Sequence, residues 1–405
     1  MGWPGGACAL SLPVPGKGGA GSGWRDGIMG LKIGIVCYPF VGGSGIVATE
    51  LGKILAERGH EIHFISSSIP FRLRKIYSHI FYHQVEVNAY SVFQYPPYDI
   101  QLACKIAEVA SREKLDILHA HYAIPHAVCA IVAKSMADHD FKIVTTLHGT
   151  DITVLGADPS LKRAIKMGIE GSDFVTAVSR SLAEETDVLI RPEKNIAVVY
   201  NFVNEKIFTR VDASHLKDEF GIRPEEKVII HVSNFRRVKR VPDVVKAFSL
   251  IAEKIPAKLL LVGDGPEMPV VGRLVKELGI GDKILFLGRQ ENLEELYSIS
   301  DLQLLASEKE SFGLAILEGM ACGVPCIATR IGGIPEVIDD GRTGYLCECG
   351  NVAEMAERAV YLLTHPSIRG QFVQAGLETV STRFSSEKIV KEYEAIYLQL
   401  VNGGR

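Results

Sequence analysis

Residues 32–53 read KIGIVCYPFVGGSGIVATELGK, and this stretch contains the pattern that decides the fold. It opens with a short apolar run rich in β-branched residues, which is typical of a buried strand. Gly42, Gly43 and Gly45 follow, and from Leu51 onward apolar residues recur at the spacing of an amphipathic helix. A strand, a glycine loop and a helix in this order predict one unit of a parallel α/β sheet, with the loop at its ligand-binding edge.

The same alternation of strand and helix continues along the chain. In the first half the predicted strands are KIGIVCY, EIHFIS, FYHQVEV, LDILHAH, FKIVTTLHG, DFVTAVS and NIAVVYN. In the second half they are KVIIHVS, AKLLLVGDG, KILFLG, DLQLLAS and VPCIATR. Because such alternation favours parallel sheets covered on both faces, we expect an α/β chain of two doubly wound, Rossmann-like domains that face a cleft.

The alternation pauses after Asn201, and this pause divides the chain. A length of 405 residues is too great for one ordinary core and suits two domains. We expect one domain over residues 29–203, a second over 204–381, and a final helix over 382–405 that crosses back to the first. Residues 1–28 are rich in Gly and Pro and lack periodicity, so they are predicted to be a disordered leader or an artefact of the assigned start.

Composition argues against several classes of function. A net charge of −4 gives no support to nucleic-acid binding, and no apolar run approaches the roughly 18 to 20 residues that cross a bilayer. The eight cysteines have no zinc-like spacing, so we expect reduced thiols in a cytoplasmic enzyme without membrane insertion. The G-G-S-G loop departs from the G-x-G-x-x-G pattern of dinucleotide-binding folds, which argues against NAD.

The sequence also argues against a metal site. His119, His121, His126 and His148 lie on two separate strand–loop units, without a carboxylate at ligand spacing. Residues 138–140 read DHD, the D-x-D form of metal-dependent transferases, but they precede a strand and therefore lie at the wrong edge of the sheet. His148 follows a strand and is better placed to hydrogen-bond a sugar hydroxyl or a phosphate.

Residues 310–326 read ESFGLAILEGMACGVPC and form the strongest candidate site. A helix is predicted from Gly313 to Cys322, because a glycine and a proline close it. The start of this helix would offer free N–H groups and the positive end of its dipole to an anion.

Glu310 and Glu318 would stand about 12 Å apart if the segment between them were wholly helical. That separation exceeds the roughly 5 to 9.5 Å between the two carboxylates of a glycosidase. The pair therefore fits two contacts with one long ligand, one at a sugar and one at a ribose. A diphosphate would then lie over the helix start between them.

A basic loop follows the first strand of the second half, where residues 231–241 read HVSNFRRVKRV. Its cations are Arg236, Arg237, Lys239 and Arg240. Charge-assisted bonds from Arg and Lys to phosphate are strong, and a metal-independent transferase needs such cations to stabilise a departing diphosphate.

On these motifs the chain resembles the family-4 retaining glycosyltransferases of the GT-B architecture. The elements ESFGLAILE, VGDGPE, FLG and GGIPEVI match that family, and the resemblance runs from Leu31 to about Val401. Longer segments resemble the members that glycosylate L-malate, namely CYPFVGGSGIVATELGK, SSIPFRL, YPPYDI, HAHYAIPHAVCA, TTLHGTDITVLG and HVSNFRRVKRV. One departure is that the family's common G-R before the basic loop reads Ser233-Asn234 here, which leaves open which arginine takes that role.

The resemblance implies UDP-GlcNAc as the sugar donor, bound by the second domain, and L-malate as the acceptor, bound by the first. It implies retention of configuration, no metal or other cofactor, and the first step of bacillithiol biosynthesis. The implied catalytic residues are Glu310, His148, Lys239 and Arg236. The implied sugar-donor contacts are Gly43, Gly288, Ser311, Phe312, Gly313, Leu314 and Glu318. The implied acceptor contacts are Ser44, Tyr122 and Thr146.

Other functions stay open at this stage. The chain could use a different small acceptor, or it could be a UDP-GlcNAc 2-epimerase or hydrolase, which shares the two-domain architecture. It could also bind a sugar nucleotide without catalysis. The sequence does not decide between a monomer and a homodimer.

Overall fold

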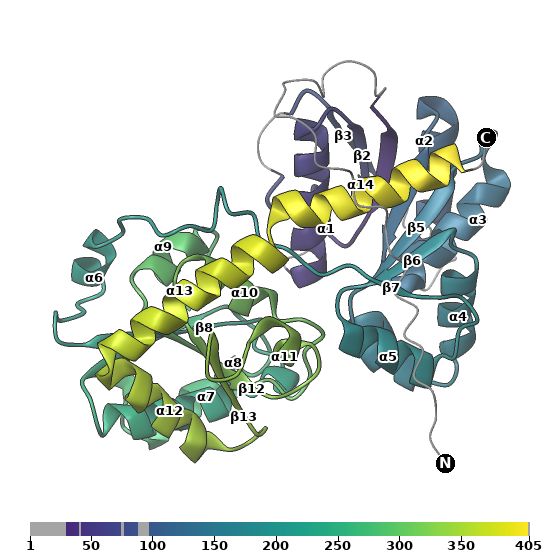
Figure 1. Cartoon of the computed structure of the whole chain (residues 1–405). Helices are drawn as coiled ribbons and strands as arrows, with labels where there is room; N and C mark the ends of the chain where they lie inside the picture. The colour runs from purple at the N-terminus through teal and green to yellow at the C-terminus, as the bar shows by residue number, and fades with distance from the viewer. Residues whose placement is uncertain (1–29, 40–41, 74–76, 88–96, 404–405) are drawn as a thin grey trace, which may run out of the picture. The chain divides into compact units, whose positions relative to one another are not determined.

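The computed structural model describes residues 30–39, 42–73, 77–87 and 97–403. Its helices and strands belong to one unit from Leu31 to Arg405, and Figure 1 labels them. The leader expected at residues 1–28 lies outside the described residues. Two sheets with parallel strands and flanking helices confirm the expected α/β class.

The first sheet has the strand order β3-β2-β1-β4-β5-β6-β7, and its described pairs are all parallel. Its strands are β1 (Lys32–Val36), β2 (Glu61–Ser66), β3 (Ile80–Gln84), β4 (Ile117–His121), β5 (Lys142–Leu147), β6 (Phe174–Ala177) and β7 (Ala197–Val198). Each strand coincides with or overlaps a predicted stretch.

Helices cover both faces of this sheet, because successive side chains of a strand point to opposite sides. Ile35 packs in a buried cluster with α1 (Gly43–Glu57), whereas Val36 packs in another cluster with α2 (Tyr98–Glu113) and α3 (Val128–Met136). The next two α-helices are α4 (Lys162–Glu170) and α5 (Arg180–Leu189).

The second sheet has the order β10-β9-β8-β11-β12-β13, again with parallel pairs. Its strands are β8 (Lys227–Val232), β9 (Ala257–Val262), β10 (Ile284–Gly288), β11 (Leu302–Leu305), β12 (Cys326–Thr329) and β13 (Gly344–Cys347). Of these, β13 was not predicted, because its four residues, GYLC, are too few for a periodic pattern and begin with glycine.

The helices of the second half alternate with these strands, and the first of them lies in the stretch where the alternation pauses. They are α6 (His215–Glu219), α7 (Val241–Ala252), α8 (Met268–Glu277), α9 (Leu293–Ser298), α10 (Leu314–Ala321), α11 (Ile334–Val337), α12 (Val352–Thr364) and α13 (Pro366–Arg383).

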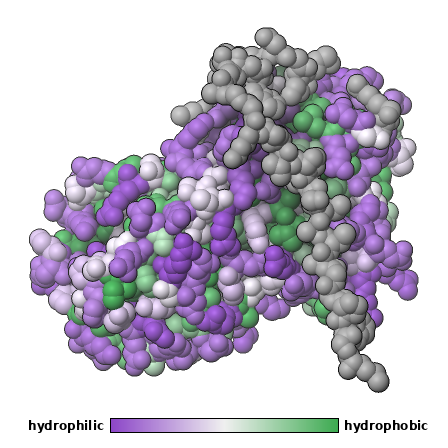
Figure 2. Space-filling model, in the orientation of Figure 1, coloured by the Kyte–Doolittle hydropathy of each residue, from purple (hydrophilic) through white to green (hydrophobic). Residues whose placement is uncertain are grey.

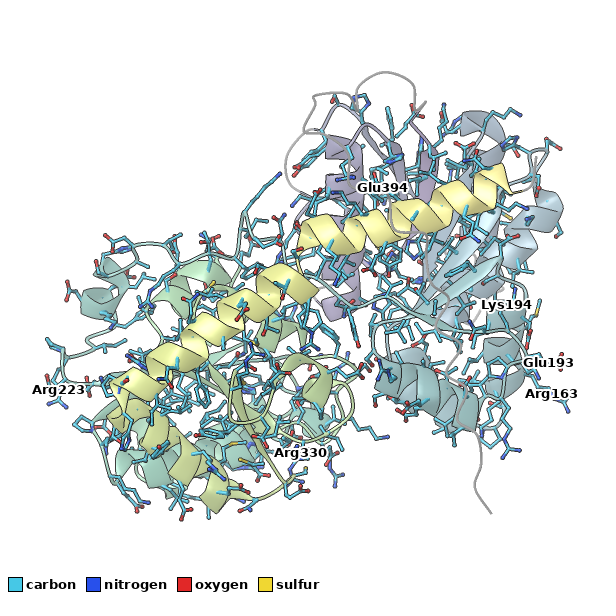
Figure 3. All side chains as sticks on the ribbon, in the orientation of Figure 1. Arg163, Glu193, Lys194, Arg223, Arg330 and Glu394 are labelled. Atoms are coloured by element: carbon cyan, nitrogen blue, oxygen red, sulfur yellow. The ribbon has the colours of Figure 1, made fainter. Side chains whose placement is uncertain are left out.

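The last helix, α14 (Ser386–Asn402), packs against α1 in the layer of the first sheet. Tyr393 and Tyr397 are buried in the same cluster as Ile35. Glu394, labelled in Figure 3, forms an ion pair with Arg58, whose Nη2 lies 2.7 Å from the Glu394 Oε2. The domain boundaries expected at residues 203 and 381 stay predictions.

Among the residues that the structure describes, no helix combines the length and apolar character needed to span a membrane. The face shown in Figure 2 is mostly hydrophilic, and its hydrophobic residues form small separate patches.

Candidate active site

Loops that follow strands of both sheets line a pocket of about 710 Å³, which we call the larger pocket because a smaller one lies beside it. Parallel strands end at the same edge of a sheet, so residues far apart in sequence meet there. The predicted residues that line it are Gly43, Ser44, Tyr122, His148, Arg236, Lys239, Glu310, Ser311, Phe312, Gly313 and Leu314. The structure therefore brings most of the predicted site together.

A smaller pocket of about 220 Å³ adjoins the first. Glu310 and Lys239 line both pockets, whereas Glu318 lines only the smaller one. Residues after β9 and β10, among them Gly263 and Gln290, complete its wall. Two joined pockets that share Glu310 form a space suited to one elongated ligand.

The start of α10 lies at the junction of the two pockets. Gly313 precedes the helix with a φ of +99°, a left-handed conformation that L side chains rarely adopt, and this lets the chain turn sharply into the helix. The helix covers only Leu314–Ala321, so the stretch from Glu310 to Glu318 is not wholly helical and the separation of about 12 Å does not apply. No side chain caps this helix start and no acidic residue occupies its first turn, so the N–H groups that precede Ile316 are open to an anion.

Glu310 and Lys239 form an ion pair between the two pockets. The Lys239 Nζ lies 2.5 Å from the Glu310 Oε2, and both side chains are largely buried, at 18% and 17% exposure. The Gly333 N–H donates to the Glu310 carbonyl at 3.0 Å. The carboxylate thus orients the ammonium group at the place where the two pockets meet.

Glu318 is buried, with 4% of its surface exposed, although it carries a carboxyl group. Burial raises its pKa to about 7, and the nearby Arg72 guanidinium opposes that rise. The Arg72 Nη2 lies 3.4 Å from the Glu318 Oε1. Arg72 was not singled out from the sequence, because 246 residues separate it from its partner.

The basic side chains of the loop after β8 do not all line the larger pocket. Among the described lining residues, Arg236 and Lys239 belong to the larger pocket, while Arg237 and Arg240 do not. The Arg240 Nε instead donates to Asp243 at 2.7 Å, at the start of α7. This arrangement favours Arg236 over the other two arginines as the second cation of the site.

His148 follows β5 and faces the larger pocket beside Tyr122. Burial lowers the pKa of His148 to about 3, so its imidazole is neutral at physiological pH. The Tyr122 hydroxyl donates to the Ser44 Oγ at 2.8 Å, which joins the loop after β4 to the start of α1. Two of the expected acceptor contacts therefore lie side by side.

Thr146 and Gly288 lie outside the residues that line the two pockets. Thr146 belongs to β5 and is fully buried; its Oγ1 lies 2.7 Å from the His119 Nε2 and 2.7 Å from the Thr176 Oγ1. The expectation that its hydroxyl contacts an acceptor is corrected, because the hydroxyl is already engaged inside the fold. Gly288 ends β10, where its carbonyl accepts from the Gly263 N–H at 2.7 Å.

Asp151 is a buried residue that sequence reasoning missed. Its Oδ1 accepts from the Gly149 N–H at 2.9 Å and its Oδ2 from the Ala123 N–H at 3.0 Å. Burial raises its pKa to about 6, although these backbone donors oppose the rise. The carboxyl group therefore ties together the two loops that bear Tyr122 and His148. Its position directly after His-Gly-Thr was a usable signal.

Two further features of the larger pocket were missed. Asn201 lines it, and its buried Oδ1 has no hydrogen-bond partner among the described residues. Gly332 has a φ of +52°, and a Cβ there would stand 2.0 Å from the Glu310 carbonyl oxygen. The loop that bears Gly332 can approach Glu310 only because it lacks a side chain at this position.

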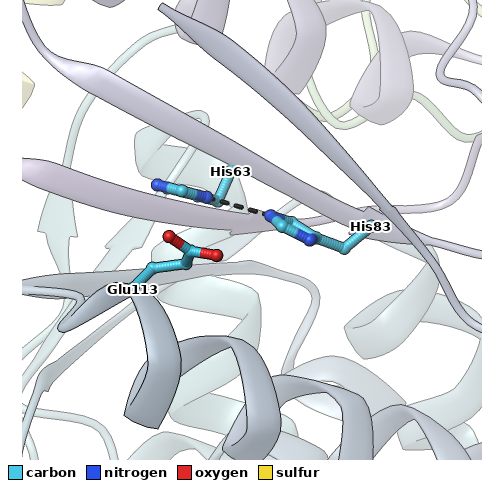
Figure 4. A group of neighbouring side chains, drawn as sticks. All are labelled: His63, His83 and Glu113. Carbon is cyan, nitrogen blue, oxygen red and sulfur yellow. Dashed lines mark hydrogen bonds between the residues drawn. The ribbon is translucent and has the colours of Figure 1, made fainter.

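One cluster of potential metal ligands lies elsewhere, on β2, β3 and α2: His63, His83 and Glu113 (Figure 4). The His63 Nδ1 and His83 Nε2 are 2.9 Å apart, and the His63 Nε2 lies 2.9 Å from Glu61. Arg112 contacts the His83 Nδ1 at 3.3 Å. Because a guanidinium only donates, the protons run from Arg112 through both rings to Glu61, and the facing nitrogens of His63 and His83 share a hydrogen bond.

Comparison with known proteins gives matches to both halves of the chain. The family model described as Glycosyltransferase Family 4 matches residues 41–206, and that described as Glycosyl transferases group 1 matches residues 212–379. The chain is 61% identical over 373 residues to the curated N-acetyl-alpha-D-glucosaminyl L-malate synthase of Bacillus anthracis. That alignment covers 92% of this chain and 98% of the relative.

Solved structures share the fold. A sucrose-phosphate synthase from Thermosynechococcus elongatus superposes with a TM-score of 0.79 at 20% identity, covering 92% of this chain and all of the other. The Anabaena protein HepE, solved in complex with UDP-glucose, superposes with a TM-score of 0.76 at 19% identity, covering 90% and 99% of the two chains. These similarities confirm the expected GT-B fold.

Proposed function

The chain belongs to the glycosyltransferases of family 4, and on that premise we propose that it transfers N-acetylglucosamine from UDP-GlcNAc to the hydroxyl of L-malate. The products would be GlcNAc-α-malate and UDP, at the first step of bacillithiol biosynthesis. The observation that carries this proposal is the high identity, over nearly the whole length of both proteins, to a curated malate synthase of this kind.

The sugar donor would extend across both pockets. Glu318, at the smaller pocket, would accept hydrogen bonds from the ribose hydroxyls. The diphosphate would then reach the junction, where the N–H groups at the start of α10 meet Lys239. Glu310 would contact hydroxyls of the sugar ring, and it already orients Lys239 through their ion pair.

The chemical step requires stabilisation of the charge that grows on the departing diphosphate. Lys239 and Arg236 line the larger pocket and would supply two positive charges, so the proposed reaction needs no metal ion. Retention of configuration would follow from substitution on the front face of the sugar, with a donor phosphate oxygen taking the proton from the acceptor hydroxyl. Glu310 and Glu318, the two carboxylates of the predicted motif, are paired with Lys239 and Arg72, which supports a mechanism in which neither acts as an enzymatic nucleophile.

The acceptor would bind beside the loops of the first sheet. Ser44 and Tyr122 line the larger pocket on that side, and their hydroxyl groups are joined by one hydrogen bond. His148 lines the same pocket beside Tyr122 and would contact the sugar or the leaving phosphate.

A direct test is incubation of the purified protein with UDP-GlcNAc and L-malate in the presence of EDTA. We expect stoichiometric release of UDP and a glycoside of the mass of GlcNAc-malate. UDP release only with another hydroxy acid would overturn the acceptor assignment. UDP release or ManNAc formation without any acceptor would instead indicate a hydrolase or an epimerase.

We also propose a cytoplasmic location for this enzyme. The described cysteines are free thiols, and most of them are buried. Burial raises the pKa of Cys37 and of Cys326, which keeps these thiols protonated and unreactive. Free thiols are typical of a reducing compartment. A homodimer is compatible with this proposal, and measurement of the mass in solution would decide it.

A further inference from the structure

A stack of histidine rings leads from the core of the first sheet to the larger pocket. The ring centroids of His119 and His121 are 4.3 Å apart, and those of His121 and His148 are 5.1 Å apart. His119 and His121 are fully buried, whereas His148 reaches the pocket. Burial lowers the pKa of each of these three rings far below its ordinary value, so each carries one N–H proton.

One contact in this stack determines where the protons lie. The His121 Nδ1 and the His148 Nε2 are 2.8 Å apart, so one of these nitrogens donates and the other accepts. If His148 donates, the proton of His121 must lie on its Nε2. That nitrogen is buried and has no partner among the described residues, so an N–H group would be left unsatisfied.

The opposite arrangement, with the proton of His121 on its Nδ1, leaves no N–H group of this ring unsatisfied. If the His121 Nδ1–H donates, only a bare lone pair remains on the His121 Nε2. Buried N–H groups without an acceptor are rarer in proteins than acceptors without a donor. The neighbouring His126 shows the same choice, because its Nδ1 contacts the His121 carbonyl and must therefore be protonated. Its buried Nε2 is then a bare lone pair without a described partner.

We propose that His121 is a positioning residue that sets the tautomer of His148, so that His148 presents a neutral Nδ1–H donor to the larger pocket. His148 then acts as a hydrogen-bond donor to a ligand oxygen, such as a sugar hydroxyl or a phosphate oxygen, and not as a general base. The catalytic consequence rests on the proposed function, whereas the tautomer itself does not.

The tautomer can be measured on the free protein by 15N NMR after histidine labelling, with a His148→Gln variant to identify the signals of His148. We expect protonated Nδ1 and unprotonated Nε2 in His148 across pH 6 to 8. A His148 protonated at Nε2 would overturn the proposal, whatever the enzyme's acceptor. This measurement needs neither substrate nor activity.

Two variants of His121 test its positioning role. His121→Asn keeps an amide N–H close to the place of Nδ1, whereas His121→Phe keeps a flat ring without a donor. With the Phe variant we expect kcat to fall about tenfold, the worth of one hydrogen bond, with a smaller change in KM and a mixture of His148 tautomers in place of the single one. The Asn variant should restore both readouts.

Controls separate this role from damage to the core. Far-UV circular dichroism and thermal unfolding establish that each variant is folded. Equal losses of kcat in the folded Asn and Phe variants, with an unchanged His148 tautomer, would overturn the positioning role. If the Phe variant does not fold, the tautomer in the unmodified protein and in the Asn variant still decides the proposal.

Discussion

At the scale of single residues, the site depends on charges held in pairs. Glu310 holds Lys239, Asp243 holds Arg240, and Glu318 contacts Arg72. The pair with Asp243 holds Arg240 away from the larger pocket, whereas the pair with Glu310 keeps Lys239 beside it. Four basic residues follow β8, but only two of them line the larger pocket among the described residues. A count of charges in the sequence therefore overestimates the positive charge that a diphosphate would meet.

Replacement of Lys239 by Ala should lower kcat by about 10² to 10³, because one preorganised charge at the departing diphosphate is lost. Steady-state UDP release would measure the effect. Arg237→Ala is the matched control, because Arg237 belongs to the same loop but does not line the larger pocket. A loss in Arg237→Ala as large as that in Lys239→Ala would contradict the assignment.

Glu318 should make folding stability depend on pH. Burial raises its pKa from 4.5 to about 7 in the folded chain. Between these values the unfolded chain releases a proton that the folded chain keeps, so stability falls as the pH rises from about 4.5 to about 7. Glu318→Gln removes this effect. The variant should therefore gain about 3 kcal/mol relative to the natural protein between pH 4.5 and pH 8.

Urea unfolding of both proteins at several pH values would measure this difference. Glu193→Gln serves as the control, because the Glu193 side chain is 90% exposed and its replacement should leave the pH dependence unchanged. Parallel stability curves for the natural protein and Glu318→Gln would show that Glu318 ionises normally in the folded chain.

At the scale of elements, helix starts and glycine loops place the ligand-binding groups. The sequence predicted α1, α10 and the strands before them, since their patterns are local. It did not predict that the loop before α11 would close on Glu310, because that approach depends on Gly332 lacking a Cβ. Nor did the four residues of β13 carry a recognisable pattern. Local periodicity identifies an element, whereas its neighbours are decided by packing.

Gly332→Ala should impair both folding and catalysis. The new Cβ would stand 2.0 Å from the Glu310 carbonyl oxygen, so the loop or Glu310 must move. The left-handed φ should lower the free energy of unfolding by about 1 to 2 kcal/mol, and the clash should lower it by about a further 1 to 3 kcal/mol. Urea unfolding and kcat/KM for UDP-GlcNAc would measure the two effects.

Gly341→Ala is a matched control for this substitution. Gly341 also has a positive φ, +75°, but a Cβ there would meet no atom within 4 Å. Its replacement by Ala should lower the free energy of unfolding only by the amount due to the left-handed φ, and it should leave kcat/KM unchanged. An equal loss of activity in both variants would mean that the close approach to Glu310 is unimportant.

At the scale of the whole molecule, residues from both sheets line the two pockets, and α14 returns the chain to the layer of the first sheet. A ligand that contacts both sets of loops binds the folded state alone. Its binding energy is therefore added to the stability of the fold.

UDP should stabilise the protein without a metal ion. At 100 times its Kd, UDP should raise the free energy of unfolding by about 2.7 kcal/mol. Thermal unfolding with UDP should give the same rise in Tm with and without EDTA, and Lys239→Ala should reduce it. Loss of the rise in EDTA would show that a divalent cation takes part in binding the diphosphate.

The sequence by itself determined the class of fold, the order of most strands and helices, and the motifs that contain Glu310, Glu318, Lys239 and His148. Each of these depends on local patterns, because backbone conformation and the burial of one face follow from neighbouring residues. Only the tertiary structure decided that Arg72 meets Glu318, that Thr146 is engaged inside the core, and that His121 contacts His148. These contacts join segments far apart in the chain. Their geometry arises from packing, which no local pattern records.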